Sequence, residues 1–465
     1  MRYCCAILLT LISIFATYAK TTVIYGNAPS YAGKMLSIRV YSDEVLHEED
    51  ELDRTTVQPN GDFKFEVEIN SVVNAFIPTE VERAFIYLEP GATYHISIPP
   101  YRERTLSEKL DPYFAPKDYL ASIVGLKKGD FNYQMMEFED AFDFYSMKHV
   151  TYGANPDSVK KSIRELRRIF SDLKNPYQKR FKEYRYVLLQ NMSVPSYPKM
   201  QDSVIRRLNV LGPDYDNPAF WDAFNNVFEG FIGNTIGSED YELFKKLVND
   251  GKAKLLLVML RERYGITNPY LCELAAIKMV GDLTDDPAFD LAHVIAMLKA
   301  MKPLLPDADN RDLLQAMVNK ASADYIGTPA PDFEAYNADG KSVKLSDYKG
   351  KLVYLNFCNS NIEQTLRDVQ VLERFHDSYQ HDLVVLNVFL YDDAATVKRL
   401  QSTCKGQVCL TTPVPDAVRH AYQVSGVPSY MLIDRQGNFM MTRGAEPNDQ
   451  FRLFLQNLLQ RPDGQ

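Results

Sequence analysis

The pattern of apolar and polar positions divides the chain into three regions. Residues 20 to about 105 alternate with period two, and the run 63–69 (FKFEVEI) places one apolar face on an extended strand. Asn60-Gly61 precedes this run, and Pro90-Gly91 separates two further alternating runs. Because both dipeptides are turn signals, we expect a hairpin at each. The pattern predicts an antiparallel, sandwich-like β-domain over residues 20–108.

The middle of the chain changes to a helical pattern. Apolar residues recur three and four positions apart in several stripes, including 220–231 and 291–298. One helix is expected to begin after Asn155-Pro156, which supplies a cap and a first turn. The absence of a repeat of fixed period argues against a solenoid. We therefore predict an all-α domain over residues 109–325, with the aromatic stripes in its core.

From residue 326 onward, strand and helix patterns alternate. Two apolar runs, 352–357 and 383–390, are each followed by a helical stretch. Two shorter strand patterns then flank Arg435-Gln436-Gly437, a third hairpin signal, before a final amphipathic helix. The order βαβα and then ββα is typical of a thioredoxin-like α/β sandwich. The predicted fold class is thus multidomain α+β, with this sandwich over residues 326–465.

The N-terminus has the features of an export signal. Arg2 is followed by about ten mostly apolar residues at 6–15, and small residues stand at Thr17 and Ala19. This apolar core is too short to cross a bilayer, which takes about 20 residues. We predict a signal peptide at residues 1–19, export to the periplasm or the outer face of the envelope, and no integral membrane segment after cleavage.

Composition excludes some classes of function. The net charge of −9, without a block of Lys and Arg, argues against a nucleic-acid partner. The seven histidines lack metal-ligand spacing, and glycine-rich phosphate loops are missing, so neither a metal nor another cofactor is expected. Signal cleavage would leave four cysteines, too few for a disulfide framework, although export permits a disulfide. They are Cys272, Cys358, Cys404 and Cys409.

Six ordered stretches of the last region resemble a known family. They are 327–333 (GTPAPDF), 339–341 (DGK), 345–348 (LSDY), 349–357 (KGKLVYLNF), 424–430 (VSGVPSY) and 432–437 (LIDRQG). Residues 326–465 resemble the envelope thiol-disulfide oxidoreductases of the TlpA/ResA type, which are AhpC/TSA-related members of the thioredoxin and peroxiredoxin superfamily. The regions before residue 326 are similar, less specifically, to the N-terminal portions of some exported proteins with such domains.

The resemblance implies where the active site would lie, and this sequence departs from it there. In the family, the strand that ends in Asn-Phe runs into a Trp-Cys-x-x-Cys turn at a helix N-terminus, and the first cysteine is the nucleophile. Here Ile362 stands at the nucleophile and Thr365 at the resolving position. Pro428 matches the family's cis-proline, after Val427. Asp368 matches a carboxylate that assists proton movement in the family.

Three cysteines of this region have other candidate roles. Cys358 stands where family members carry Trp, and a buried core residue is favoured over a displaced reactive thiol. Cys404 and Cys409 are separated by four residues including Gly406, a spacing that permits a structural disulfide. The alternatives are that both are free thiols or that they form a redox-active pair.

These observations lead to two functional hypotheses. The first is a non-catalytic binding or structural module of the cell envelope, with a groove at Ile362, Asp368, Val427 and Pro428 for an extended peptide or an envelope protein. The alternative is a thiol-disulfide oxidoreductase that uses Cys404 and Cys409 or Cys358. The balance leans away from an enzyme.

Overall fold

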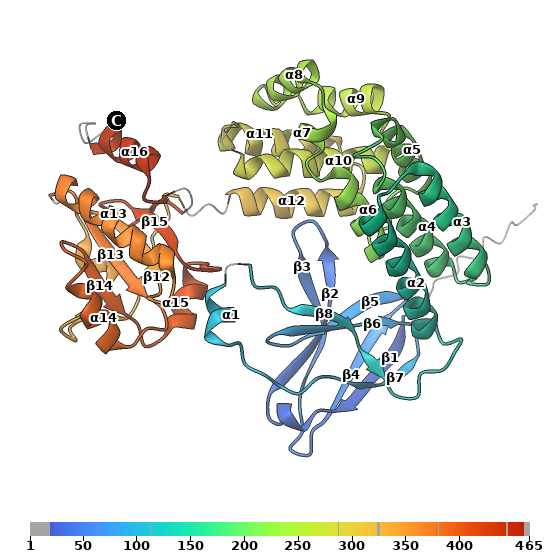
Figure 1. Ribbon diagram of the computed structural model, residues 1–465, viewed down its shortest axis with the longest axis horizontal. Helices are drawn as coiled ribbons and strands as arrows, with labels where there is room; N and C mark the ends of the chain where they lie inside the picture. The colour runs from blue at the N-terminus through green and yellow to red at the C-terminus, as the bar shows by residue number, and fades with distance from the viewer. Residues whose placement is uncertain are drawn as a thin grey trace, which may run out of the picture. The chain divides into compact units, whose positions relative to one another are not determined.

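The computed structural model (Figure 1) confirms a β-sheet region, a helical region and a C-terminal thioredoxin-like domain, in that order. It describes residues 19–111, 113–286, 288–322, 326–379, 381–442 and 445–459. The predicted signal peptide lies outside the described residues except for Ala19. The described chain forms two compact units, one from residues up to Arg102 with Pro116–Val318, and the other from Glu103–Ala115 with the chain from Asn319 onward.

The N-terminal region contains two sheets that share one core. The four-stranded sheet has the order β4 (Asp62–Ile69), β1 (Lys20–Asn27), β7 (Thr93–Ser97) and β9 (Ser122–Ile123). The five-stranded sheet has the order β3 (Glu48–Thr56), β2 (Met35–Asp43), β5 (Val73–Pro78), β6 (Glu82–Leu88) and β8 (Lys117–Leu120). Buried residues of both sheets, such as Phe65 and Ile86, belong to one cluster. Most pairs are antiparallel, but β1–β7 and β6–β8 are parallel.

The prediction of hairpins at Gly61 and Gly91 is wrong, although a turn forms at each position. Gly61 and Gly91 have φ of +92° and +80°, a conformation that glycine adopts readily. The flanking strands do not pair with each other: β3 pairs with β2, while β4 pairs with β1. Likewise β6 pairs with β5, and β7 pairs with β1. Each turn carries the chain from one sheet to the other, so consecutive strands face each other across the core.

The helical region belongs to the same unit as these sheets. Its helices are α2 (Phe131–Tyr152), α3 (Pro156–Ile169), α4 (Pro176–Asn191), α5 (Gln201–Leu211), α6 (Pro218–Phe228), α7 (Phe231–Thr235), α8 (Ser238–Asn249), α9 (Ala253–Tyr264), α10 (Pro269–Gly281), α11 (Leu291–Met301) and α12 (Ala308–Ser322). The cap predicted at Asn155 is present, and Asn-Pro also starts α4, α6 and α10. Tyr87 of β6 is buried among the helices, and its main chain hydrogen-bonds the Asn132 amide of α2.

The second unit contains a seven-stranded sheet. Its strands follow the order β11 (Ser342–Val343), β10 (Ala335–Asn337), β14 (Val408–Thr411), β13 (Leu383–Phe389), β12 (Leu352–Cys358), β15 (Ser429–Ile433) and β16 (Phe439–Met441). Strands β12, β13 and β14 are parallel, and β15 and β16 form the third predicted hairpin. The helices of the unit are α13 (Glu363–Tyr379), α14 (Ala394–Gln401), α15 (Pro415–Ala421), α16 (Asp449–Leu459) and α1 (Leu106–Leu110).

Helix α1 joins this unit from a distant part of the sequence. Leu110 is buried in the cluster that includes Phe357, and the Arg419 guanidinium donates a hydrogen bond of 2.7 Å to the carbonyl oxygen of Lys109. The predicted boundary at residue 108 therefore falls inside a short segment that packs on the thioredoxin-like domain. Among the residues that the structure describes, no helix is long and apolar enough to cross a membrane.

Candidate functional site

The candidate site is built where β12 ends and α13 begins. All seven residues of β12 are buried, because the strand lies between β13 and β15 and both faces of the sheet are covered. Because successive side chains of a strand point to opposite faces of the sheet, Phe357 lies in one core cluster and Cys358 in another. Cys358 therefore lies in the interior.

Polar side chains fix the turn between β12 and α13. The Asn359 amide donates a hydrogen bond of 2.6 Å to the carbonyl oxygen of Leu390, and its oxygen accepts one of 2.9 Å from the Asn361 main chain. The Ser360 main chain and hydroxyl both donate to the Asp392 carboxylate. These hydrogen bonds attach residues 359–361 to the chain just after β13. The polar groups of the turn are therefore bonded to the domain itself.

The resemblance places the family's cysteine positions at Ile362 and Thr365, whose surroundings the structure describes. Ile362 is half-buried and packs against the cluster that contains Phe357 and Val427. Thr365 is fully buried, and within the described part of the chain its hydroxyl oxygen finds no hydrogen-bond partner. A hydrocarbon and a hydroxyl cannot form the mixed disulfide of thiol exchange.

The loop before β15 contains two further candidate residues, Val427 and Pro428. The Val427–Pro428 peptide bond is cis, in agreement with the position of the family's cis-proline. Strand β15 begins at Ser429, which pairs with Phe357 of β12. Val427 is buried in the core cluster against which the half-buried Ile362 packs.

Asp368 is part of a buried hydrogen-bonded group on α13. Its side-chain oxygens accept hydrogen bonds of 2.6 Å from the Gln364 amide and 2.5 Å from the Tyr430 hydroxyl. Burial raises the pKa of Asp368 above its usual value of 3.8, although both hydrogen bonds oppose the shift. Sequence reasoning missed Tyr430. The alternation of side chains along a strand could have indicated it. Tyr430 pairs with Asn356, so both side chains lie on the sheet face that α13 covers.

The three remaining thiols of the domain share one buried cluster. Cys358, Cys404 and Cys409 are each 0% exposed and pack with apolar side chains that include Val369 and Phe389. All three are free thiols in the structure. Burial raises the pKa of Cys358 well above its ordinary range. A hydrogen bond from the Cys409 thiol lowers the pKa of Cys404 and raises that of Cys409.

A chain of amides crosses the same buried layer, and sequence reasoning missed it. Asn356 donates to Asn387, Asn387 donates to Gln407, and Gln407 donates to the carbonyl oxygen of Val369, each over 2.8 Å. The chain connects β12 and β13 to α13. Its signal in the sequence is one asparagine within each of the two central apolar runs.

The cysteine outside this domain is also buried. Cys272 lies in α10, and burial raises its pKa to about 11. The described residues hold no group of three His, Cys, Asp or Glu side chains that could bind a metal ion.

Comparison with known proteins supports the assignment of this domain. Residues 326–441 match the AhpC/TSA family. The chain is 30% identical over 117 residues to the thiol-disulfide oxidoreductase ResA of Geobacillus thermodenitrificans, a match over 24% of this chain and 65% of that protein. For ResA of Bacillus cereus the identity is 24% over 159 residues, or 33% of this chain and 91% of the relative.

The search of solved structures returned thioredoxin-like proteins. An exposed lipoprotein thioredoxin from Streptococcus pneumoniae is 28% identical, with a TM-score of 0.25, and the match covers 28% of this chain and 100% of that structure. The chain spans about 65% of the length of the first ResA relatives. The family match, the ResA similarity and the strand order agree, and residues 326–441 are an AhpC/TSA-family domain of the TlpA/ResA, thioredoxin-like type.

Proposed function

We propose that the C-terminal domain is a non-catalytic binding module that holds an extended peptide beside Val427 and Pro428. The observation that carries this proposal is Ile362, an apolar side chain at the position where the resemblance places the nucleophile. The buried hydroxyl of Thr365 occupies the resolving position. A domain that keeps this shape without a thiol there has lost exchange chemistry but not a surface for binding.

The geometry at the end of the sheet supports peptide binding. The paired region of β15 begins at Ser429, so Val427 lies just outside the ladder with β12. An extended segment can bind main chain outside a ladder through main-chain hydrogen bonds, while pockets select its side chains. The half-buried Ile362 would supply the apolar contact, which favours a peptide with an apolar residue at that point.

The alternative function is thiol-disulfide exchange at Cys404 and Cys409. The hydrogen bond between these thiols and the lowered pKa of Cys404 favour it, because a thiolate is the attacking species. The similar ResA proteins are thiol-disulfide oxidoreductases, which favours the same chemistry. Against it, both thiols are 0% exposed, and exchange requires access for a second protein's disulfide. The non-catalytic function is therefore preferred.

We also propose that the protein is exported and acts in the periplasm or at the outer face of the envelope. The support is the charged start, the short apolar run 6–15 and the small residues before Lys20. Export would place the binding module among unfolded or extended envelope proteins.

Peptide binding can be tested with a library of short extended peptides and two matched variants of the full chain. Ile362→Asp places a charge in the proposed groove, whereas Leu453→Asp changes an exposed leucine of α16 in the same unit. We expect peptides with an apolar centre to bind the wild type, and Ile362→Asp to weaken binding about ten-fold. Leu453→Asp should leave binding unchanged. Equal affinity of wild type and Ile362→Asp for every bound peptide would contradict the proposal.

A further inference from the structure

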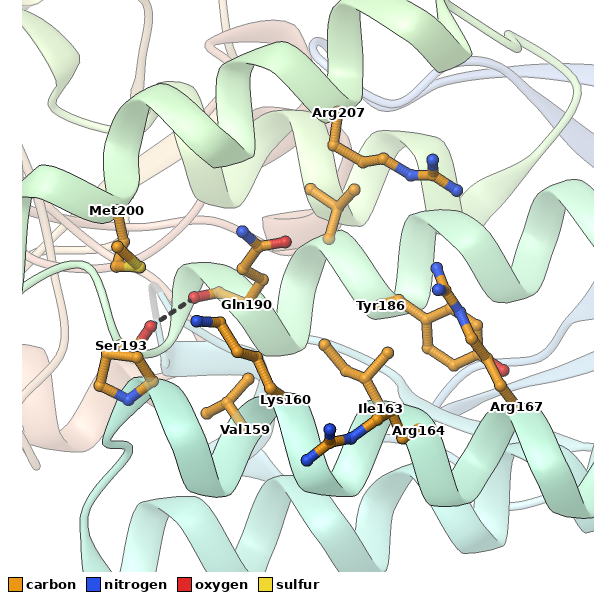
Figure 2. Close-up of a pocket in the computed structure, with 12 residues that line it drawn as sticks. Val159, Lys160, Ile163, Arg164, Arg167, Tyr186, Gln190, Ser193, Met200 and Arg207 are labelled. Atoms are coloured by element: carbon orange, nitrogen blue, oxygen red, sulfur yellow. Dashed lines mark hydrogen bonds between the residues drawn. The ribbon is translucent and has the colours of Figure 1, made fainter.

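A cavity of about 430 Å³ lies between α3, α4 and α5, in the unit that does not contain the thioredoxin-like domain. Its volume falls within the range of small-molecule pockets. Figure 2 shows α3 and α5 on opposite sides of the cavity with α4 between them. The lining residues are Pro156, Val159, Lys160, Ile163, Arg164, Arg167, Tyr186, Val187, Gln190, Ser193, Met200 and Arg207.

Positive charge gathers at the rim of this cavity. Lys160, Arg164 and Arg167 follow one another along α3 at spacings of four and three, which places them on one face of the helix. Arg207 comes from α5, and Figure 2 shows its guanidinium group and that of Arg167 turned towards each other. Among the described lining residues, four are cationic and none is acidic.

The available negative charge does not balance this rim. Glu183 accepts a hydrogen bond of 2.8 Å from Arg167 and another from Arg207, so one carboxylate serves two guanidinium groups. Lys160 and Arg164 make no ion pair within the described part of the chain. Arginine side chains bind carboxylate and phosphate groups with two parallel hydrogen bonds. The rim is thus complementary to an anionic group.

The floor of the cavity has a different character. Val159 and Val187 are buried there, and Ile163 is half-buried beside them. Tyr186 is 3% exposed, and its hydroxyl lacks a hydrogen-bond partner among the described residues. An unpaired buried hydroxyl costs free energy that a ligand's polar atom could recover. A bare inorganic anion would leave the apolar floor unused, and a neutral hydrocarbon would leave the cations unused.

We propose that this cavity binds a free single-chain amphiphile with a carboxylate or phosphate head group. The tail lies against Val159, Ile163 and Val187, while Lys160 and Arg164 bind the head group. The Tyr186 hydroxyl pairs with a polar atom of the ligand. The proposal concerns the helical region and does not depend on the function of the thioredoxin-like domain.

Calorimetric titration of the full chain tests the ligand class. The probes are octanoate and octyl phosphate below their micelle concentrations, with octanol, inorganic phosphate and phosphatidylglycerol vesicles as comparisons. We expect one molecule of either octyl anion to bind per chain, with octanol and inorganic phosphate about ten-fold weaker or more. Failure of both octyl anions to bind, equal binding of inorganic phosphate, or binding to vesicles alone would overturn the proposal.

Two pairs of substitutions locate the site. Lys160→Gln with Arg164→Gln removes two charges from the rim, and Lys161→Gln with Arg168→Gln removes two exposed charges of the same helix outside it. We expect the first pair to weaken octyl phosphate binding about ten-fold and the second to change it less than about two-fold. Equal losses for both pairs would overturn the proposal, because they would indicate attraction by the general charge of α3.

Tyr186→Phe provides a variant that conserves the fold. Because the hydroxyl it removes has no partner among the described residues, the variant should unfold at the same temperature as the wild type or higher. We expect its affinity for octyl phosphate to fall about three-fold or more. An unchanged affinity in the folded variant would contradict the role of this hydroxyl and the placement of the ligand.

Discussion

The turn after β12 and the cavity between α3, α4 and α5 differ in how their polar groups are used. In the turn, Asn359 and Ser360 bond to the end of β13. In the cavity, Lys160 and Arg164 lack ion-pair partners within the described chain. The turn before α13 thus bonds its polar groups to the domain itself, apart from the buried Thr365 hydroxyl, whereas a region outside the family match holds charges without ion-pair partners among the described residues. A buried polar group without a partner, such as the Tyr186 hydroxyl, needs an explanation that ligand binding can supply.

The largest expected effect is a gain of activity. The double substitution Ile362→Cys with Thr365→Cys restores the family's spacing at the N-terminus of α13, where the helix dipole stabilises a thiolate. We expect insulin reduction by this variant to exceed that of the wild type about ten-fold or more. A variant that folds but shows no gain would indicate that the fixed turn no longer permits exchange at this position.

The second effect concerns the stability of the buried layer. Gln407→Leu removes the acceptor of the Asn387 amide and the donor to the Val369 carbonyl oxygen. We expect it to lower the free energy of unfolding by about 2–3 kcal/mol, measured by urea denaturation. As the control, Lys160→Gln with Arg164→Gln should change it by less than about 0.5 kcal/mol, because these charges are exposed. Equal losses in the two variants would indicate that the hydrogen bonds of Gln407 stabilise the fold no more than the exposed charges of α3 do.

A smaller effect is expected at the turn itself. Asp392→Ala removes the carboxylate that accepts hydrogen bonds from the main chain and hydroxyl of Ser360. The turn would lose its attachment to the end of β13, so we expect a loss of about 1–2 kcal/mol in the free energy of unfolding. Hydrogen exchange of the 359–362 amides should also become faster. Unchanged exchange would indicate that the turn is held by its apolar contacts instead.

The smallest effect is a pH dependence at Asp368. Because burial raises its pKa above 3.8, the folded chain binds this proton more tightly than the unfolded chain. Its contribution to stability is complete below about pH 3.8 and is lost as the pH rises through the higher folded pKa. Compared with Asp368→Asn, the wild type should therefore lose stability as the pH rises above about 3.8, as measured by urea unfolding at each pH. A difference that stays constant or grows with pH would contradict the raised pKa.

The sequence predicted turns better than it predicted which strands pair with each other. The turns at Gly61 and Gly91 form as expected, but dipeptide signals do not say whether the next strand stays in the same sheet. The hairpin at Arg435-Gln436-Gly437 was correct, since β15 and β16 are adjacent in one sheet. Pairing depends on the apolar faces of distant strands, which a local pattern does not contain.

The candidate site was also predictable only in part. The order of the motifs located Ile362, Thr365 and the cis bond before Pro428. The role of Tyr430 and the amide chain needed the sheet register, which brings residues from separate strands together. The cations of α3 gave no signal, because a charged helix face is usually solvated and only the packing of α4 and α5 makes it the rim of a cavity.

The central claim is that the thioredoxin-like domain does not exchange disulfides, and a thiol map with a parallel insulin-reduction assay tests it most directly. The full chain is alkylated before and after reduction and after incubation with insulin, and each labelled cysteine is located by mass spectrometry. We predict that Cys358, Cys404 and Cys409 do not change state with insulin and that insulin is not reduced above the level of Cys404→Ser. Cycling of Cys404 and Cys409, with insulin reduction that disappears in Cys404→Ser, would contradict the account.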